Sequence, residues 1–475
     1  MTAAGAAAAI AFGPAVPAAD RTGLAPRWGK RGNRTYGNAM PAQNANGGDH
    51  PIVQTKFTAD PAPLVHDGIV YLYTGHDEDN AYGFLMRNWL CYSSTDMVNW
   101  TDHGAFASLK TFSWAEQNNG AWASQVIARN GKFYFYAAVF MKERPHNAIA
   151  VAVADKPTGP FTDALGHPLV RGDGFIDPTV FIYNDGQAYL YWGNPNLWYA
   201  KLNNDMISLS GKIVKDASFA KKPGKPDAFH YQEGPWAYER NGHYYMVYAS
   251  TCCPEGIAYA MGHTPTGPWK FKGYIMKPDR RSSGNHPGII DYKGRSYVFG
   301  FDYELNFART DKHRERRSVC VAEIHYNPDG TIREIPWWNN AKAVEQIGTL
   351  NPYVRTDAAT ICWSEGIKSE SGSQGEMCVY PTRANAFIKV KGVDFGNGAR
   401  SFTASVAAAA KGGKIELRLD SPTGARIGVC MVPNTGGATQ WTTASCRVEH
   451  ATGVHDLYFI FTGEEALRFD WWIFK

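Results

Sequence analysis

The sequence predicts an all-β protein, a five-bladed β-propeller followed by a β-sandwich of the jelly-roll kind. The first observation is a repeat, in which a polar or aromatic opener leads into a short strand and then a turn that contains glycine. The openers fall at intervals of 53 to 62 residues: Asp60, Trp122, Asp177, Glu233 and His286. Repeats of several short strands at such spacing are typical of propeller blades.

The second observation is that each opener segment runs into an aromatic-rich strand, as in Val70-Tyr-Leu-Tyr and Phe133-Tyr-Phe-Tyr. Asp-Gly, Asn-Gly and Lys-Gly pairs separate the two strands, which is hairpin chemistry. The third observation is composition: aromatic residues make up 13% of the chain, charged residues 19%, and there are 48 glycines. This mix suits an all-β protein with tight turns, and aromatic surfaces suit sugars.

A chain of 475 residues is expected to form two to three domains. We expect an Ala/Gly-rich lead over 1–48, the propeller over 49–340, a polar linker over 341–354 and the β-sandwich over 355–475. The strands predicted in the last module are Ala386–Lys391, Ser401–Val406, Lys414–Leu419, Ala425–Val429 and His455–Phe461. These are short and separated by turns, as in a sandwich.

Charge and hydropathy exclude some partners. The net charge of +4 gives no reason to expect nucleic acid or an anionic membrane. No apolar run approaches the ~18 residues of a spanning helix. The first 20 residues are Ala-rich and end in small residues, like an export signal without a basic start. An export signal and a disordered tail both fit this composition. We expect the protein to be secreted, to the periplasm or the extracellular space. We also expect it to be a monomer.

The eight cysteines do not have the spacing of a zinc site. A bridge between the adjacent Cys252 and Cys253 needs a strained turn, so we expect two thiols there. The four in the last quarter of the chain fit either disulfides or buried thiols.

The openers bring carboxylates to one place. The first strand of each blade lines the central channel, so Asp60, Asp177 and Glu233 are expected to converge. An unpaired buried charge is expensive, and proteins break packing rules mostly at functional sites. Carboxylates held together repel, which raises the pKa of at least one, as general acid catalysis near neutral pH requires. Alone, an Asp before Pro is more simply a turn residue.

These residues also resemble a known family. Thr58-Ala-Asp60-Pro, Phe175-Ile-Asp177-Pro-Thr-Val and Gln232-Glu233-Gly-Pro are similar to the three catalytic motifs of glycoside hydrolase family 43, over about residues 50–335. That family is a five-bladed propeller that cleaves α-L-arabinofuranosides and β-xylosides with inversion. The resemblance implies that Asp60 is the general base, Glu233 the general acid and Asp177 the residue that tunes and orients the acid. It implies no required cofactor.

Inversion makes chemical sense of this arrangement. One carboxylate activates water and the other protonates the leaving oxygen, with about 6.5–9.5 Å between them. Blades one and four are not neighbours in a ring of five, so Asp60 and Glu233 face each other across the axis. Asp177 opens blade three, beside blade four, and a close anion raises the pKa of the acid.

Other residues are candidates for contact with the sugar. The resemblance implies that Trp122 forms a wall of the pocket and that His286 lies near the axis, close to a water-coordinated calcium in some relatives. Phe84 lies on a long excursion after the first hairpin and can overhang the channel mouth. Trp192 and Trp236 fit either the pocket or packing between blades. Arg316 or Arg317 can reach the pocket floor.

The last module resembles family 6 carbohydrate-binding modules in Val393-Asp-Phe-Gly396, Gly453-Val-His-Asp-Leu-Tyr458 and Phe469-Asp-Trp-Trp472. In relatives an Asn contributes to the sugar cleft, but Arg468 stands near that place here. A structural calcium in such modules uses a Glu and an Asp. This chain has Ala359 near the first place and Asp470 near the second, so Asp470 is the one calcium candidate.

The expected function is an inverting exo-glycosidase that releases terminal α-L-arabinofuranosyl groups from arabinoxylan or its oligosaccharides, a step in xylan degradation. A β-xylosidase or a bifunctional xylosidase/arabinofuranosidase is the alternative, because the two pentoses present similar hydroxyl patterns. An endo-arabinanase would need an open groove. A catalytically silent carbohydrate-binding propeller is the alternative from another class.

Overall fold

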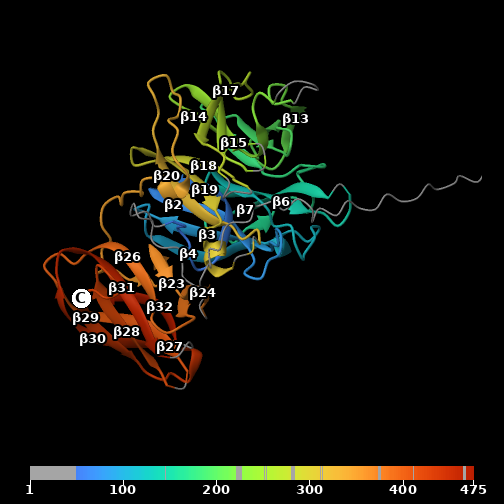
Figure 1. The fold of residues 1–475 in the computed structure, drawn as a ribbon. Coiled ribbons are helices and arrows are strands. Elements are labelled where there is room, and N and C mark those ends of the chain that lie inside the picture. The colour runs from blue at the N-terminus through green and yellow to red at the C-terminus, as the bar shows by residue number, and fades with distance from the viewer. Residues whose placement is uncertain are drawn as a thin grey trace, which may run out of the picture. The chain divides into compact units, whose positions relative to one another are not determined.

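The computed structural model describes residues 50–144, 146–220, 227–250, 252, 254–279, 284–310, 312, 314–372, 376–409, 411–463 and 467–475. The expected lead over 1–48 lies outside these residues. β-Strands dominate the described chain (Figure 1). Helical structure within it is limited to α1 (Glu304–Arg309) and the 3-10 turns η2 (Leu109–Thr111) and η3 (Trp338–Asn340). No described helix has the length and apolar character that crossing a bilayer requires.

Five antiparallel sheets follow one another over the described part of residues 57–324. Blade one holds β1 (Phe57–His66), β2 (Ile69–Asp77), β3 (Asn88–Ser94) and β4 (Trp100–Ser108). Blade two holds β5 (Ser124–Arg129), β6 (Lys132–Phe140) and β7 (Asn147–Ala154), with β8 (Thr162–Asp163) and β9 (Val170–Arg171) both paired to β7. Blade three holds β10 (Thr179–Ile182), β11 (Ala188–Trp192), β12 (Trp198–Leu202) and β13 (Leu209–Lys215). Blade four holds β14 (Tyr231–Arg240), β15 (His243–Ser250), β16 (Ile257–Gly262) and β17 (Lys270–Met276), and blade five β18 (Gly288–Tyr292), β19 (Arg295–Asp302) and β20 (Ser318–Ile324).

The first strands of the blades form a closed ring. β1 contacts β5, β5 contacts β10, β10 contacts β14, and β18 contacts β1. The remaining gap is bridged by the indole N–H of Trp236 on β14, which donates to the carbonyl of Ile289 on β18 at 3.1 Å. The chain before β1 also meets the last blade, because the amide of Ile52 donates to the carbonyl of Val319 at 2.9 Å. This is the arrangement of a five-bladed propeller.

Hairpin chemistry explains how the blades form. At four of the five first hairpins, both central residues have positive φ, as type I′ turns require. These pairs are Asp67-Gly68, Asn130-Gly131, Asn241-Gly242 and Lys293-Gly294. Asp and Asn tolerate this conformation and glycine adopts it without cost. The turns predicted from the sequence therefore form where they were expected.

The C-terminal module is a β-sandwich, drawn in orange to red in Figure 1. One sheet contains β24 (Ile367–Ser371), β25 (Met377–Pro381), β32 (Arg468–Phe474), β27 (Ala399–Ala408) and β30 (Gly437–Ala451), with β21 (Thr356–Asp357) paired to β32. The other contains β23 (Trp363–Glu365), β26 (Ala386–Asp394), β31 (Val454–Gly463), β28 (Gly413–Leu419) and β29 (Arg426–Val432). Buried rings of Phe402, Phe459, Phe469 and Trp472 pack between the sheets.

The module and blade one share a seam. The strand β22 (Thr360–Ile361) of the module pairs with β4 and extends that sheet. Gln346, within the expected linker, donates to Asp96 of blade one at 3.1 Å and to the carbonyl of Lys391 in the module at 3.0 Å. Residues 341–354 therefore contact both modules.

The cysteines differ from expectation at one place. Cys252 is disulfide-bonded, so the prediction of a thiol at this residue is wrong. Cys253 lies outside the described residues. None of the four cysteines of the last quarter forms a disulfide: Cys362, Cys378, Cys430 and Cys446. The sequence left both disulfides and buried thiols possible for these four, and the structure has thiols.

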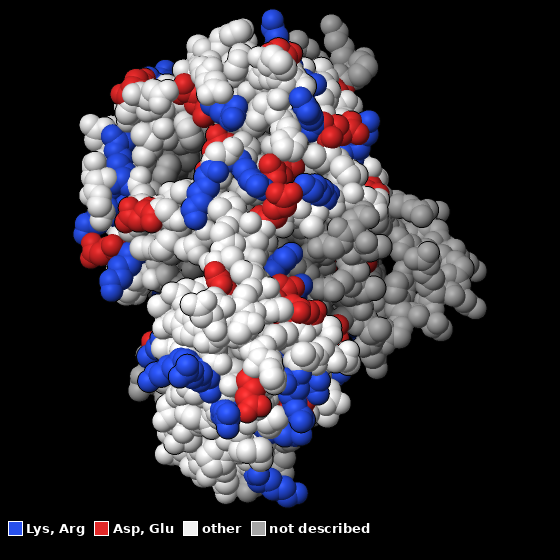
Figure 2. Space-filling model, turned by 90° about the vertical axis from the view of Figure 1, so that its left-hand side faces the viewer, with Lys and Arg blue, Asp and Glu red and all other residues white. Residues whose placement is uncertain are grey.

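The face drawn in Figure 2 carries charges of both signs. Basic and acidic side chains are interspersed on it, with uncharged surface between them. That face therefore does not present a field of a single sign.

Candidate active site

Asp60 is placed by an irregularity in β1. The pairing of β1 with β2 shifts register between Ala59 and Ala62, and Asp60 has φ of 51°. Such a bulge re-aims a side chain out of the ladder, and Asp is among the few residues that tolerate positive φ. The side chain is nearly buried, with 6% of its surface exposed.

The same backbone feature recurs, but not at every opener carboxylate. Asp177 has φ of 58° and so does Gly234, and each precedes a proline, as Asp60 does. Glu233 therefore lies one residue before the position that Asp60 and Asp177 share. Glycine fills that position in blade four, so the three opener carboxylates are not equivalent in their place along the first strand.

Gly234 links the third and fourth blades. Its backbone N–H donates to Oδ2 of Asp177 at 3.0 Å. A Cβ atom at residue 234 would lie 3.0 Å from Nδ1 of His286, so the imidazole rests directly against the glycine. The backbone beside the predicted acid is thereby fixed by one opener residue and covered by another.

Arg317 is the cation at this centre. Its Nη1 donates to Oδ1 of Asp60 at 2.7 Å, while its Nε and Nη2 donate to the carboxylate of Asp77, both at 2.9 Å. The amide of Arg317 also donates to Asp77, which is completely buried. Charge-assisted bonds of this kind are strong and directional. Of the two arginines that the sequence left open, Arg317 is the one at the site, since Arg316 donates to the carbonyl of Ala81.

Glu233 is poised between its two protonation states. Burial, and then the negative charge of Asp60, raise its pKa to about 7, while a hydrogen bond from Asn194 and the charge of Arg317 oppose the rise. A carboxylic acid with such a pKa can donate a proton near neutral pH. The sequence analysis assigned the rise to Asp177, but burial is the larger cause and the carboxylate that adds to it is Asp60.

Asp177 shows a rise in the same direction. Burial raises its pKa well above the usual range, and the charges of Glu233 and Asp60 add to the effect. The Gly234 amide and Arg317 act against it. The pair Asp177 and Glu233 therefore carries fewer than two negative charges around neutral pH.

His286 and a fifth carboxylate, Glu255, also belong to this centre. Nδ1 of His286 is 3.8 Å from Oδ1 of Asp60, and burial lowers the pKa of the imidazole. Glu255, which is 2% exposed, accepts a bond from the amide of Asn285 at 2.7 Å. Burial and then the charge of Glu233 raise its pKa well above the usual range. No repeat position or motif marks Glu255, and sequence reasoning missed it, as it missed Asp77 and Asn194.

The predicted aromatic residues divide into two groups. Trp122 is half-buried, packs on Phe140 with ring centroids 4.3 Å apart, and has an indole N–H without a partner among the described residues. Phe84 is 46% exposed, and its ring lies 5.1 Å from the guanidinium carbon of Arg317. Both keep exposed surface, so their role in substrate binding stays a prediction.

Trp192 and Trp236 belong to the packing instead. Trp192 has no exposed surface and packs on Phe175, with centroids 5.4 Å apart. Trp236 is 6% exposed and uses its indole N–H to bridge blades four and five. Neither side chain presents a surface for substrate in this structure, so the pocket interpretation of these two residues is corrected to interblade packing.

The donor sets give no metal cage. Among the described residues, no three His, Cys, Asp or Glu side chains converge as metal ligands. Backbone carbonyls and water also bind calcium, so calcium held through water near His286 and calcium at Asp470 stay predictions.

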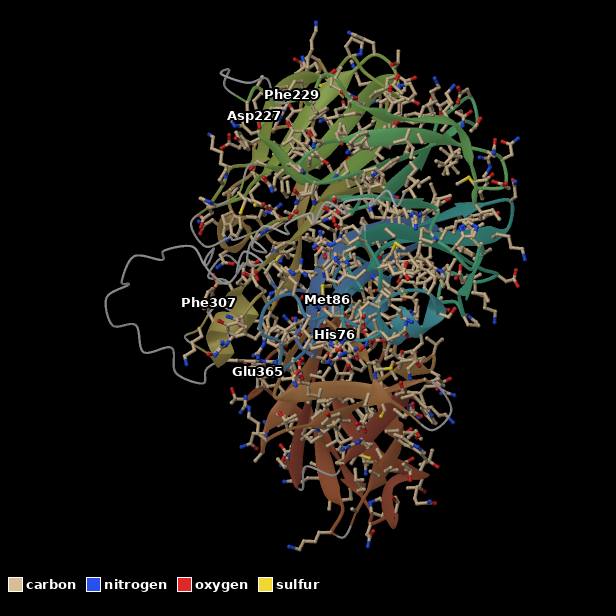
Figure 3. All side chains as sticks on the ribbon, turned by 90° about the vertical axis from the view of Figure 1, so that its right-hand side faces the viewer. His76, Met86, Asp227, Phe229, Phe307 and Glu365 are labelled. Atoms are coloured by element: carbon tan, nitrogen blue, oxygen red, sulfur yellow. The ribbon has the colours of Figure 1, made fainter. Side chains whose placement is uncertain are left out.

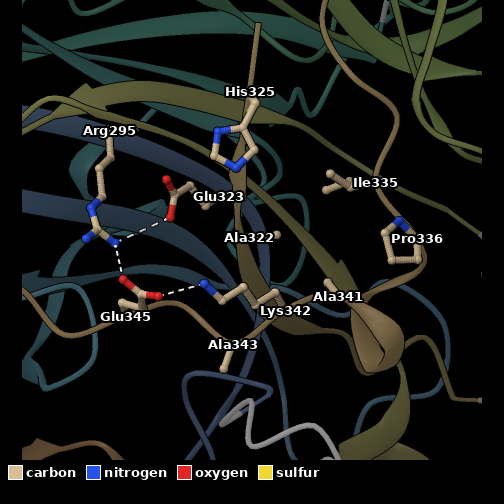
Figure 4. Close-up of a pocket in the computed structure, with 10 residues that line it drawn as sticks. All are labelled: Arg295, Ala322, Glu323, His325, Ile335, Pro336, Ala341, Lys342, Ala343 and Glu345. Atoms are coloured by element: carbon tan, nitrogen blue, oxygen red, sulfur yellow. Dashed lines mark hydrogen bonds and ion pairs between the residues drawn. The ribbon is translucent and has the colours of Figure 1, made fainter.

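A hollow of 380 Å³ lies elsewhere, where β19 begins, at the end of blade five opposite His286 (Figure 4). Its charged residues pair with one another, since Arg295 contacts Glu323 and Glu345, and Lys342 contacts Glu345. The opener carboxylates do not line it, so it is distinct from the centre around Asp60.

Both domains match known protein families and characterised relatives. The model of "Glycosyl hydrolases family 43" matches residues 49–332, and that of "Carbohydrate binding module (family 6)" matches residues 357–475. The arabinoxylan arabinofuranohydrolase of Bacillus subtilis is 32% identical over 90% of this chain and 92% of its own length. A xylosidase/arabinosidase of Bacteroides ovatus is 31% identical over 59% of this chain and 95% of its own.

Solved structures lead to the same family. The crystal structure of a family 43 arabinoxylan arabinofuranohydrolase from Bacillus subtilis, in complex with cellotetraose, has a TM-score of 0.79 at 30% identity. The match covers 92% of this chain and 100% of that one. The fold class and family predicted from the sequence are confirmed, and the chain belongs to glycoside hydrolase family 43, with a family 6 carbohydrate-binding module after the hydrolase domain.

Proposed function

We propose that the protein is an inverting exo-acting α-L-arabinofuranosidase that releases terminal arabinofuranosyl groups from arabinoxylan or arabino-xylo-oligosaccharides. The observation that carries the proposal is the match to an arabinoxylan arabinofuranohydrolase across both domains. The gathered opener carboxylates supply the acid–base chemistry that such an enzyme needs.

In the proposed reaction, Asp60 takes a proton from a water molecule that attacks the anomeric carbon. Glu233 gives its proton to the glycosidic oxygen on the other side of the ring, and the bond from the anomeric carbon to that oxygen breaks. The attack comes opposite the leaving group, so the sugar is released with inverted configuration. Arg317, which bonds Asp60 and Asp77, holds the base in position.

Asp177 orients the acid in this scheme. It accepts the N–H of Gly234, which directly follows Glu233, and so fixes the backbone that carries the acid. Asn194 bonds Oε2 of Glu233 and fixes the carboxyl group itself. Catalytic groups must be held close to their productive geometry, and these two contacts supply that restraint.

Around the carboxylates, Trp122 forms a wall for the terminal sugar, His286 its floor and Phe84 the rim. An apolar face on an aromatic ring suits the C–H face of a pentose. Calcium held through water near His286 is part of the proposal, and calorimetric titration of the protein with calcium tests it.

The second candidate is a β-xylosidase or a bifunctional enzyme. The match to a xylosidase/arabinosidase over the hydrolase domain favours it. The two are distinguished by release of nitrophenol from the α-L-arabinofuranoside and from the β-D-xyloside, together with the products released from arabinoxylan.

We expect arabinose from arabinoxylan, and faster release from the arabinofuranoside. Faster release from the xyloside would establish the second candidate. No release from either substrate or from the polymer would favour a carbohydrate-binding protein without catalysis.

Secretion and a monomeric state are also proposed. A polymeric substrate cannot enter a cell, which favours an enzyme outside it. Activity confined to the cytoplasmic fraction of producing cells, or a dimer by light scattering, would contradict these two proposals.

A further inference from the structure

The loop over residues 78–87 forms a rim above Arg317. Phe84 faces the guanidinium, and Sδ of Met86 accepts a bond from Nη2 of Arg317 at 3.1 Å. Tyr82, 74% exposed, is stacked by Arg314 with 4.8 Å between the guanidinium carbon and the ring centroid. One exposed aromatic ring of this loop, Phe84, thus lies beside the residue that bonds Asp60, and a second, Tyr82, lies two residues earlier in the same loop.

Blade two fixes the returning limb of this loop. The amide of Met86 donates to Oδ1 of Asn119 at 2.9 Å, and its carbonyl accepts from the amides of Gly120 and Ala121, both at 3.1 Å. These residues lead directly into Trp122. The returning limb is therefore part of the same rigid frame as the wall of the proposed sugar pocket.

The outgoing limb is fixed by the C-terminal module. Nζ of Lys368 on β24 lies 2.5 Å from Oδ2 of Asp79, which is two residues beyond the end of β2. Burial acts to raise the pKa of Asp79, but the charges of Lys368 and Arg309 outweigh it and lower that pKa. In Figure 3, His76 and Met86, at either end of this stretch, are labelled on the propeller beside the orange strands of the module.

The position of Lys368 is itself determined by the seam. The next residue, Ser369, bonds Nζ of Lys56 at 2.5 Å and Oδ2 of Asp102 at 2.7 Å. Lys56 and Asp102 form an ion pair of 2.6 Å whose side chains are 14% and 4% exposed. Strand β24 is thus docked on blade one. The backbone that carries Lys368 is therefore held in place, and its ammonium contacts Asp79.

We propose that Lys368 is a positioning residue for the active site, through which the C-terminal module holds the aromatic rim of loop 78–87 against the leaving-group side of the substrate. The inference rests on the proposed function. The terminal sugar is held among the openers, so the chain it leaves extends outward past Tyr82 and Phe84. Aromatic faces stack on sugar rings, and a fixed rim binds such a chain at lower entropic cost.

The experiment compares a polymer with a small substrate. We expect Lys368→Met and Asp79→Asn each to lower kcat/KM on arabinoxylan about fivefold, through KM, in keeping with a partly exposed ion pair. Activity on nitrophenyl α-L-arabinofuranoside, whose leaving group is small, stays within about twofold. The double variant behaves as either single one, and Lys368→Arg retains most of the activity on polymer.

A matched control is Lys132→Met, which removes an exposed ion pair with Asp155 far from the seam and leaves both activities unchanged. Unchanged polymer kinetics in Lys368→Met, equal losses on both substrates, or additive losses in the double variant would each overturn the proposal.

A second measurement does not depend on activity. Hydrogen exchange of the amides over 78–87 is expected to be faster in Lys368→Met than in the parent protein, with no change elsewhere in blade one. Identical exchange would overturn the inference even in an active enzyme. An unsubstituted protein that releases no arabinose would contradict the proposed function instead, and the exchange result would still decide the contact.

Discussion

Gly234 determines how the blade-four carboxylate is presented. It takes the positive-φ position that Asp60 and Asp177 take in their own blades, which moves Glu233 one residue earlier along the strand. Its N–H is then free to bond Asp177, while Glu233 meets Asn194. Asp177 therefore contacts the backbone of Gly234 and leaves the carboxyl group of Glu233 to Asn194.

Gly234→Ala is expected to lower both stability and activity. Alanine at this positive φ is less stable by about 1–2 kcal/mol because its Cβ approaches the backbone. The same Cβ also presses on the imidazole of His286. Gly242→Ala is the matched control, since its φ is also positive but no atom lies within 4 Å of the added Cβ. Calorimetry and kcat measured on both variants check this, and an equal loss of kcat in the two would contradict it.

Glu233→Gln is expected to reduce kcat on arabinoxylan by about 10²- to 10⁴-fold with an unchanged circular dichroism spectrum, because the amide cannot donate the proton. Substantial retained activity on the natural substrate would remove Glu233 from the acid role.

The pH profile tests the surroundings of Glu233. Since the acid must be protonated, kcat/KM is expected to fall as the pH rises through about 7. The bond from Asn194 lowers the pKa of Glu233, so Asn194→Ala raises that pKa and moves the basic limb to higher pH. A limb that stays in place or moves to lower pH would contradict the contact.

The sequence predicted the carboxylates of the repeat but not the residues that bind them. Asp60, Asp177 and Glu233 follow a spacing and a motif. Arg317 and Asp77 meet across 240 positions of the chain, and neither stands at an opener. Their pairing depends on closure of the ring, which no local pattern encodes.

At the scale of elements, hairpins were predictable and aromatic roles were not. The Asx-Gly turns depend on the φ preferences of two residues, so local chemistry suffices. Trp122 is an opener and Trp192 ends a strand of the next blade, yet Trp122 keeps exposed surface while Trp192 has none. Which face of a blade is covered depends on the neighbouring blade.

Substitution of these two tryptophans should separate binding from packing. Trp122→Ala is expected to lower kcat/KM on the arabinofuranoside clearly while leaving Tm almost unchanged. Trp192→Ala is expected to cost about 3–5 kcal/mol of stability through the cavity it leaves. Steady-state kinetics and denaturant unfolding measure the two effects, and a pure stability loss in Trp122→Ala would place that residue with the packing group.

At the scale of the whole molecule, the two domains were predictable and their seam was not. The contacts of Lys56 with Asp102 and Ser369 join positions that no repeat relates. Burial acts to raise the pKa of Asp102, but Lys56 and the hydrogen bonds to the carboxylate outweigh it and lower that pKa. The carboxylate therefore stabilises the fold above its usual pKa, and this contribution is lost as the pH falls through the lowered value.

Asp102→Asn is expected to lower stability at pH 7 by about 3 kcal/mol, because it leaves Lys56 nearly buried without its counter-charge. The difference from the parent protein should shrink in acid, where the parent carboxyl is also neutral. Calorimetry at the two pH values checks this. Asp155→Asn, in the exposed pair with Lys132, is the control and should be nearly silent.

The ring is closed by contacts between its first and last blades, and this has a consequence for synthesis on the ribosome. Asp60 and Asp77 emerge early, whereas Arg317 emerges more than two hundred residues later. Until it does, the proposed catalytic base has no counter-charge and Ile52 has no Val319 to pair with. Nascent or prematurely terminated chains therefore carry the acidic residues of the centre without its cation. The order of translation itself delays assembly of the site until the last blade has been made.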